Sequence, residues 1–180
     1  MGLPATGKST LARLIAARYG FALLRKDAVK EPLLDVIGAN DRAESRRLSD
    51  ASFAVLFSIA RECLASGAGL VLEGNFRPGE HEASVLSLFE GLTGPRITQV
   101  VCRAAEAVRV ARLQARVNDP SRHSGHRDAA LAAEKYTADV LSLPGERLVF
   151  DTDDITCVDD AIVRARPLLS ALDQLTLRKS

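Results

Sequence analysis

The sequence predicts an α/β fold with a mostly parallel sheet, formed by one domain over residues 1–180. Short apolar runs typical of buried strands alternate with longer segments of helical periodicity, the pattern of parallel strands joined by crossover helices. A glycine-rich segment over residues 2–7 leads directly into the first helical segment. The length and composition agree with this prediction of one domain. A chain of 180 residues with 47% apolar and 26% charged side chains is typical of one globular domain and excludes a disordered or fibrous chain.

The strands follow from short apolar runs and the helices from apolar residues at helical spacing. The expected strands are residues 21–24, 69–73, 97–102 and 147–150. The expected helices are residues 8–19, 29–37, about 50–65, 80–89, 104–117, 129–141 and 158–172. Gly20 provides a stop for the first helix, Pro32 suits the first turn of the second, and Ser49 or Asp50 can cap the third. The polar segment 118–128 is expected to be a loop.

Charge and cysteine content narrow the possible partners. Lys and Arg total 24 against 23 Asp and Glu, a net charge of +1, so a nucleic-acid partner is possible but not favoured. No apolar run approaches the roughly 18 residues of a membrane span, and no signal peptide is visible. The three cysteines fit neither a disulfide framework nor a zinc site. We therefore expect a cytoplasmic protein with no membrane partner.

A phosphate-binding loop is the most specific motif in the chain. Residues 2–10 read Gly-Leu-Pro-Ala-Thr-Gly-Lys-Ser-Thr and match G-x-x-x-x-G-K-[ST]. Glycines let backbone amides turn toward phosphate oxygens at the positive end of a helix. Lys8 is expected to reach the β- and γ-phosphates, and the Ser9 hydroxyl to hold Mg²⁺. The expected nucleotide-binding residues are Gly2, Pro4, Ala5, Thr6, Gly7, Lys8, Ser9 and Thr10. A chance glycine turn is disfavoured, since an amphipathic helix follows Lys8.

The loop should follow a buried strand, yet only Met1 precedes Gly2. In P-loop proteins this strand usually lies in the middle of the sheet. We therefore expect that the first strand is absent or truncated here, with roughly five to eight apolar residues encoded upstream. A stop codon directly upstream would argue against this expectation.

Acidic residues end two of the expected strands, where ligands lie in an open α/β sheet. Asp27 can accept a hydrogen bond from a substrate hydroxyl and orient it toward the γ-phosphate, and Lys30 can hold an anionic substrate group. Glu73 stands in the place of a Walker B acid, where it can hold Mg²⁺, and Asn75 can contact substrate. The alternatives are that Asp27 only caps a helix and that Glu73 only leads into solvent.

Basic residues are concentrated before and within segment 118–128. Arg109, Arg112 and Arg116 occupy the preceding helix, and Arg112 and Arg116 share one helix face. We expect a lid over about 117–128, in which Arg116, and next to it Arg112, stabilises the transferring phosphoryl group. The alternative is a solvated basic helix. Nearby His123 and His126 are three residues apart, too few for a zinc site.

The order of these motifs resembles the P-loop kinases of the AAA-domain "predicted kinase" group over essentially the whole chain. Relatives of this group include polynucleotide 5′-kinases, chloramphenicol phosphotransferase and zeta toxins. Residues 122–126, Arg-His-Ser-Gly-His, resemble an R-H-P-G-H stretch of the group. The resemblance implies the three-layer P-loop NTPase fold of nucleoside and nucleotide kinases. It also implies Asp27 as general base, Lys30 as a substrate-phosphate ligand and Arg116 as the lid arginine.

Together these observations predict an ATP- and Mg²⁺-dependent phosphotransferase acting on a hydroxyl of a small molecule or nucleotide. A guanine-specificity motif N-K-x-D is absent, which disfavours a GTPase. Two alternatives remain open: a polynucleotide 5′-hydroxyl kinase, and a nucleotide-binding regulatory ATPase with little turnover. Salt-dependent binding to oligonucleotides would favour the first alternative.

Overall fold

The computed structural model describes residues 1–93, 96–117, 119–120, 123, 125, 140–155 and 158–177. Its strands are β1 (Ala22–Arg25), β2 (Leu70–Glu73), β3 (Thr98–Arg103) and β4 (Glu146–Asp151). Its helices are α1 (Lys8–Tyr19), α2 (Lys26–Ile37), α3 (Arg42–Ala65), α4 (Glu82–Ser87), α5 (Glu106–Val117) and α7 (Val158–Leu177). The helix expected over residues 129–141 lies outside the described residues except at its end. No helix in the described part of the chain is long and apolar enough to cross a membrane.

The strands form two parallel pairs, β1 with β2 and β3 with β4. Arg25 lies opposite Glu73 at the carboxyl end of the first pair, and Arg103 lies opposite Asp151 at that of the second. Met1 runs beside β3, where its amino group donates to the Val100 carbonyl and its own carbonyl accepts from the Cys102 amide at 2.8 Å. In both pairs the two strands end together, and the loops that follow these carboxyl ends are the places where ligands bind in open α/β sheets.

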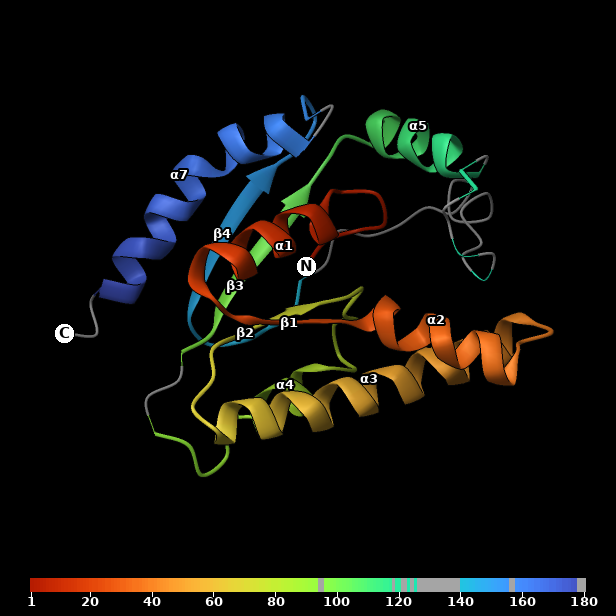
Figure 1. Cartoon of the computed structure of the whole chain (residues 1–180), viewed down its shortest axis with the longest axis horizontal. Coiled ribbons are helices and arrows are strands. Elements are labelled where there is room, and N and C mark those ends of the chain that lie inside the picture. The colour runs from red at the N-terminus through yellow and green to blue at the C-terminus, as the bar shows by residue number, and fades with distance from the viewer. Residues whose placement is uncertain are drawn as a thin grey trace.

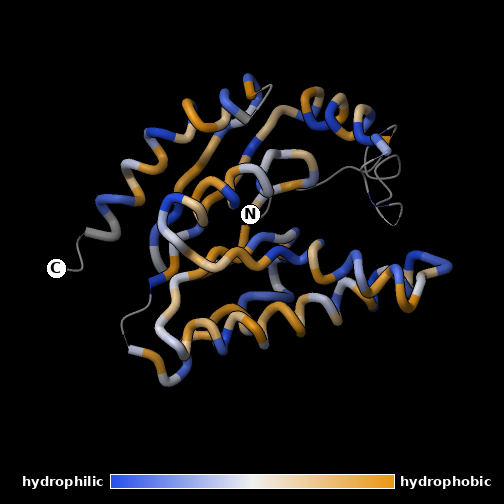
Figure 2. Tube along the Cα trace, viewed as in Figure 1, coloured by the Kyte–Doolittle hydropathy of each residue, from blue (hydrophilic) through white to orange (hydrophobic). Residues whose placement is uncertain are grey.

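Helices cover the strands from two sides (Figure 1). α1 contacts β1, β2 and α7, whereas α3 contacts β1 and β2 from the other side. The main core joins α1, β3, β4 and α7. Its buried members are Leu11, Ile15, Cys102, Phe150, Ala165, Leu168 and Leu172. In Figure 2, β1 and β2 are mainly apolar while α3 and α7 alternate between apolar and polar residues, as expected of amphipathic helices on a buried sheet.

Several helix boundaries differ from the sequence expectation, most of all the starts of α2 and α3 and the end of α7, which reaches Leu177. α3 begins at Arg42, and neither Ser49 nor Asp50 caps it: the Asp41 side chain accepts from the Glu44 amide at 2.8 Å, and the Glu44 carboxylate accepts from the Asn40 amide at 2.7 Å. The Asp41 cap satisfies the Glu44 amide in the first turn, and the bond from Asn40 holds the preceding backbone, so the helix starts earlier than expected. α2 begins at Lys26, directly after β1, so Asp27 lies in its first turn.

Candidate functional site

The phosphate loop has the backbone of an anion-binding turn. Gly2, Ala5 and Gly7 all have positive φ, at 138°, 62° and 76°. A Cβ on Gly2 would lie 2.3 Å from the Cys102 carbonyl oxygen, so only glycine fits there. Ala5 keeps its positive φ although it carries a side chain, a strain that persists when the surrounding structure imposes it. Successive amides in such a turn form a concave surface suited to phosphate, at the start of α1.

Lys8 lies over this loop at the beginning of α1. Its ammonium donates to the Leu3 carbonyl at 2.7 Å. Burial lowers the pKa of Lys8, while the nearby acidic groups, Glu73 first and Asp27 after it, raise that pKa, and Arg116 lowers it. The structure therefore brings the charges of Lys8, Glu73, Asp27 and Arg116 into one neighbourhood, although they come from four separate elements.

Ser9 and Glu73 meet at the edge of the loop. The Ser9 hydroxyl donates to Glu73 Oε2 at 3.2 Å. Glu73 is only 6% exposed, which excludes the alternative that it simply leads into solvent. Thr10 follows in the first turn of α1. Hydroxyl and carboxylate oxygens are the donor types that Mg²⁺ prefers, so this pair fits a magnesium ion bound together with phosphate. Among the described residues, no group of three His, Cys, Asp or Glu side chains could hold a metal by itself.

Asp27 begins α2 beside a buried lysine. Lys26 Nζ lies 2.6 Å from Asp27 Oδ1, with the Lys26 side chain 7% exposed and the Asp27 side chain 37% exposed. The partly exposed carboxylate can therefore meet a ligand, whereas its cation is enclosed. Sequence reasoning missed Lys26. The signal was present, since this lysine directly follows an apolar strand and precedes the expected base.

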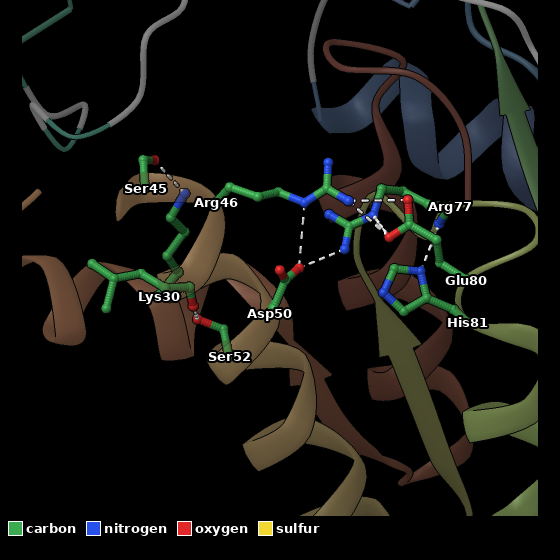
Figure 3. A network of polar contacts seen from close by, with 9 residues as sticks. Lys30, Ser45, Arg46, Asp50, Ser52, Arg77, Glu80 and His81 are labelled. Atoms are coloured by element: carbon green, nitrogen blue, oxygen red, sulfur yellow. Dashed lines mark hydrogen bonds and ion pairs between the residues drawn. The ribbon is translucent and has the colours of Figure 1, made fainter. Parts of the chain in front are cut away.

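Lys30 and Asn75 come from two segments near Asp27, the helix α2 and the segment after β2. Lys30 donates to the Ser45 hydroxyl of α3 at 2.9 Å (Figure 3), so its ammonium points into the region between α2 and α3. Asn75 follows β2 by two residues and is exposed. Both positions are compatible with contact to a second substrate, and the structure places them on separate elements around the first turn of α2.

An ion-pair network borders this region (Figure 3). Arg77 donates to Asp50 and to Glu80, both at 2.6 Å, and Arg46 donates to Glu80 at 2.8 Å. Burial alone would raise the pKa of Glu80, but the hydrogen bonds from both arginines outweigh it and lower the pKa. The network ties the segment after β2, which carries Asn75, to α3.

A buried histidine lies beneath the network and extends it into the apolar layer. His81 Nδ1 accepts from the Arg77 amide at 2.8 Å, and its ring lies 4.1 Å from that of Phe53. Burial, assisted by the charge of Arg77, lowers the pKa of His81. A neutral ring whose Nδ1 accepts a hydrogen bond carries its proton on Nε2, so His81 serves the packing of this segment as a neutral group.

Helix α5 turns its arginines toward the phosphate loop. Arg109 is buried and its Nε donates to the Pro4 carbonyl at 3.1 Å. Arg112 donates to the carbonyls of Ala5, Thr152 and Ile155 and to the Thr152 hydroxyl. Arg116 is half-buried one turn further and acts on the charge of Lys8. Arg109 and Arg112 therefore hold carbonyls of the phosphate loop, whereas Arg116 is the arginine that acts on Lys8. Arg112 differs from expectation, because its described partners are protein oxygens.

Thr152 is the second position that the sequence did not reveal. It is 2% exposed, and its hydroxyl donates to the carbonyls of Arg103 at 3.0 Å and Thr6 at 3.3 Å. Its Cγ2 would contact a Cβ placed on Gly7 at 3.5 Å. Thr152 follows β4, at the strand end where functional groups gather. Arg112 and Thr152 together fix the back of the phosphate loop.

Replacing Arg112 with methionine is expected to lower the free energy of unfolding by about 2 to 3 kcal/mol, because several enclosed carbonyls lose charge-assisted hydrogen bonds. Lysine should not restore this loss, since a single ammonium cannot span the same acceptors. Urea denaturation measures the change. Gln114→Met, on the exposed side of α5, is the matched control. An Arg112→Met variant as stable as this control would show that the bonds are not needed.

Part of the expected lid over 117–128 lies against α2. His123 Nε2 is 2.9 Å from Asp35 Oδ1, and the Gly125 amide donates to His123 Nδ1 at 3.0 Å. A Cβ on Gly125 would lie 2.5 Å from Leu34, so backbone and helix are in close contact there. Arg122, His126 and Arg127 are outside the described residues. The described lid positions therefore lie beside the helix that carries Asp27 and Lys30.

Comparison with known proteins agrees with this geometry. The family model described as an AAA domain matches residues 1–141. Among the solved structures that match is a crystal structure of a "putative kinase" from Chloroflexus aurantiacus J-10-fl, with 31% identity and a TM-score of 0.78. The match covers 93% of this chain and 94% of that one. No curated protein matches the chain. The expectation of an α/β P-loop NTPase fold with parallel strands is confirmed.

Proposed function

The chain belongs to the AAA-domain family, a kinase-like family of P-loop proteins, and from this premise we propose that it transfers the γ-phosphate of ATP to a hydroxyl group of a small molecule or nucleotide. The observation that carries the proposal is the gathering of charges around Lys8. A carboxylate at the start of α2, a second one at the end of β2 and an arginine from α5 all act on this ammonium. A protein that only binds nucleotide does not need an acceptor-side carboxylate at this place.

In the proposed reaction the acceptor oxygen forms a bond to the γ-phosphorus. The bond from that phosphorus to the β–γ bridging oxygen breaks, and ADP leaves with the electron pair. Asp27 orients the acceptor hydroxyl and takes its proton, which later passes to solvent. Lys8 and Arg116 offset the negative charge on the transferring group, which is the main requirement of a loose transition state. Lys30 and Asn75 contact the acceptor.

The oxygen donors of Ser9 and Glu73 fit Mg²⁺, as their 3.2 Å contact beside the loop indicates. When bound, magnesium neutralises phosphate charge and holds the phosphates in one orientation. Ser9 would hold the ion through its hydroxyl, and Glu73, which accepts the hydrogen bond of that hydroxyl, would add a negative charge beside it. The nucleotide itself would be held by the amides and side chains of residues 2–10.

Replacing Glu73 with glutamine is expected to raise the Mg²⁺ concentration needed for half-maximal transfer by roughly 10- to 100-fold, the usual effect of altering a group that orients a metal ligand. The amide keeps the size of the side chain but removes its charge. Titration of the transfer rate with MgCl₂ measures the change. Glu62→Gln, on the exposed surface of α3, controls for the lost charge. Equal magnesium requirements in both variants would contradict the role of Glu73.

An acceptor screen tests the proposed function. ATP labelled in its γ-phosphate is incubated with the protein and a panel of nucleosides, nucleoside monophosphates, sugars, polyols and an oligonucleotide with a free 5′-hydroxyl. Label should move to at least one panel member, and Lys8→Met should abolish the transfer. Transfer to the oligonucleotide alone would favour the polynucleotide kinase alternative. Tight ATP binding with no transfer to any member would favour a regulatory nucleotide-binding protein and contradict the proposal.

A further inference from the structure

Lys26 stands out because a lysine is buried where one is unfavourable. The residue is 6% exposed and is the first residue of α2. Enclosing an ammonium removes its hydration, and the amino end of a helix repels positive charge. An apolar residue would avoid both penalties. The lysine therefore requires an explanation beyond packing.

The compensation lies in Asp27, at 2.6 Å from Nζ. Neighbouring residues on a helix do not normally face each other, so the Lys26 side chain must curl back to reach this carboxylate. Gly74, directly after β2, leaves room for the Lys26 side chain because it has no Cβ. A Cβ at this position would lie 3.1 Å from Lys26 Cβ and 3.4 Å from the Phe53 ring. Gly74 thus lies against the lysine, while the Asp27 side chain stays partly exposed.

We propose that Lys26 is a positioning residue for the reaction, which holds the Asp27 carboxylate ionised and in one orientation toward the acceptor hydroxyl. This inference rests on the proposed function. The contact to Oδ1 fixes the plane of the carboxylate, so Oδ2 also has a defined direction. An ammonium group in direct contact with the carboxylate disfavours protonation of Asp27. It makes Asp27 a reliable hydrogen-bond acceptor and a weak base, which suits a loose transition state that needs orientation more than early deprotonation.

Other charges also surround Asp27, and the test must separate them from Lys26. They are Lys8 of α1, whose pKa Asp27 raises and on which Glu73 and Arg116 also act, and Lys30 and Glu31, which follow Asp27 by three and four residues on α2. Lys26 contacts Asp27 Oδ1 directly and is buried. Changing Lys26 alone therefore removes the enclosed charge and leaves the others in place.

The variant Lys26→Gln shortens the side chain by one atom and keeps a hydrogen-bond donor for Asp27 but removes the charge, so the fold should persist. Carboxyl-carbon NMR, with the Asp27 signal assigned by its loss in Asp27→Asn, gives the titration midpoint directly. The midpoint should rise by about one pH unit or more, as for loss of an adjacent opposite charge. Arg61→Gln, which removes an exposed charge on α3, should leave the midpoint unchanged.

Kinetics use the panel member that the wild-type protein phosphorylates fastest. In Lys26→Gln we expect kcat to fall by roughly 10- to 100-fold, as for a misplaced reacting group, with the KM for ATP within about twofold of wild type. The acid limb of the pH–rate profile should move upward with the NMR midpoint. Lys26→Arg, which keeps the charge, should retain the wild-type position of that limb.

Three results would overturn the inference. An unchanged titration midpoint of Asp27 in Lys26→Gln would show that the two groups are not coupled. The proposed phosphoryl transfer by the wild-type protein would not be affected by that result. A moved midpoint with unchanged kinetics would show that the coupled carboxylate takes no part in the reaction. Absence of transfer in the wild type would refute the proposed function, and with it the positioning role, while NMR would still report the ion pair.

Discussion

Replacing Arg116 with alanine is expected to lower kcat for phosphoryl transfer by about 10³-fold, the lower end of the effect of a positioned arginine at a transferring phosphoryl group. The reason is its place at the end of α5, where its charge acts on Lys8 of the phosphate loop. Because the charge it would stabilise is largest in the transition state, the KM for ATP should change much less than kcat. Steady-state rates with the best acceptor, together with ATP binding by calorimetry, measure both quantities.

Two further variants make this result specific. Arg116→Lys keeps a positive charge but not the planar fork, and it should recover only part of the lost rate. Gln114→Ala, on the exposed side of the same helix, should behave as wild type. A loss of less than about tenfold in Arg116→Ala would show that this arginine does not stabilise the transferring phosphoryl group.

The variant Asp27→Asn is expected to lower kcat by about 10²- to 10⁴-fold, the usual contribution of a group that accepts a proton in the transition state. The amide has nearly the same shape but cannot take a proton. ATP binding should persist, since the phosphate loop is made by other elements. The acid limb of the pH–rate profile that belongs to this carboxylate should disappear in the residual activity.

Thermal unfolding of the wild-type protein and of Asp27→Asn shows whether a lower transfer rate comes from the reaction itself or from a less stable fold. Removing the charge of Asp27 leaves Lys26 enclosed without its carboxylate, so some loss of stability is expected. Temperatures well below the melting point of the variant must therefore be used. Glu62→Gln on α3 serves as the control for a lost exposed negative charge. Full transfer activity in folded Asp27→Asn would show that Asp27 takes no part in the reaction and serves only in the first turn of α2.

Much of the fold could be predicted from local pattern. The alternation of strands and helices, the parallel pairing and the start of α1 at Lys8 follow from periodicity and from the phosphate-loop motif, because these signals act over a few residues. The start of α3 could not be predicted in the same way. Its cap depends on the Asp41 side chain accepting from the Glu44 amide while the Glu44 carboxylate accepts from the Asn40 amide, and the polar residues Ser49 and Asp50 were equally plausible caps from the sequence.

For the candidate site, too, some features follow from the sequence and others only from the tertiary structure. The sequence alone determined the loop of residues 2–9, the carboxylates Asp27 and Glu73 and the arginine-rich α5, since motif spacing and strand ends mark such positions. Only the tertiary structure decided what each charge meets. It turned Arg112 toward carbonyls of the loop and of Thr152, kept Arg116 near Lys8, and enclosed Lys26 against Asp27. The physical reason is that burial and distance between elements set the strength of a charge interaction, and neither is written in the spacing of residues along one chain.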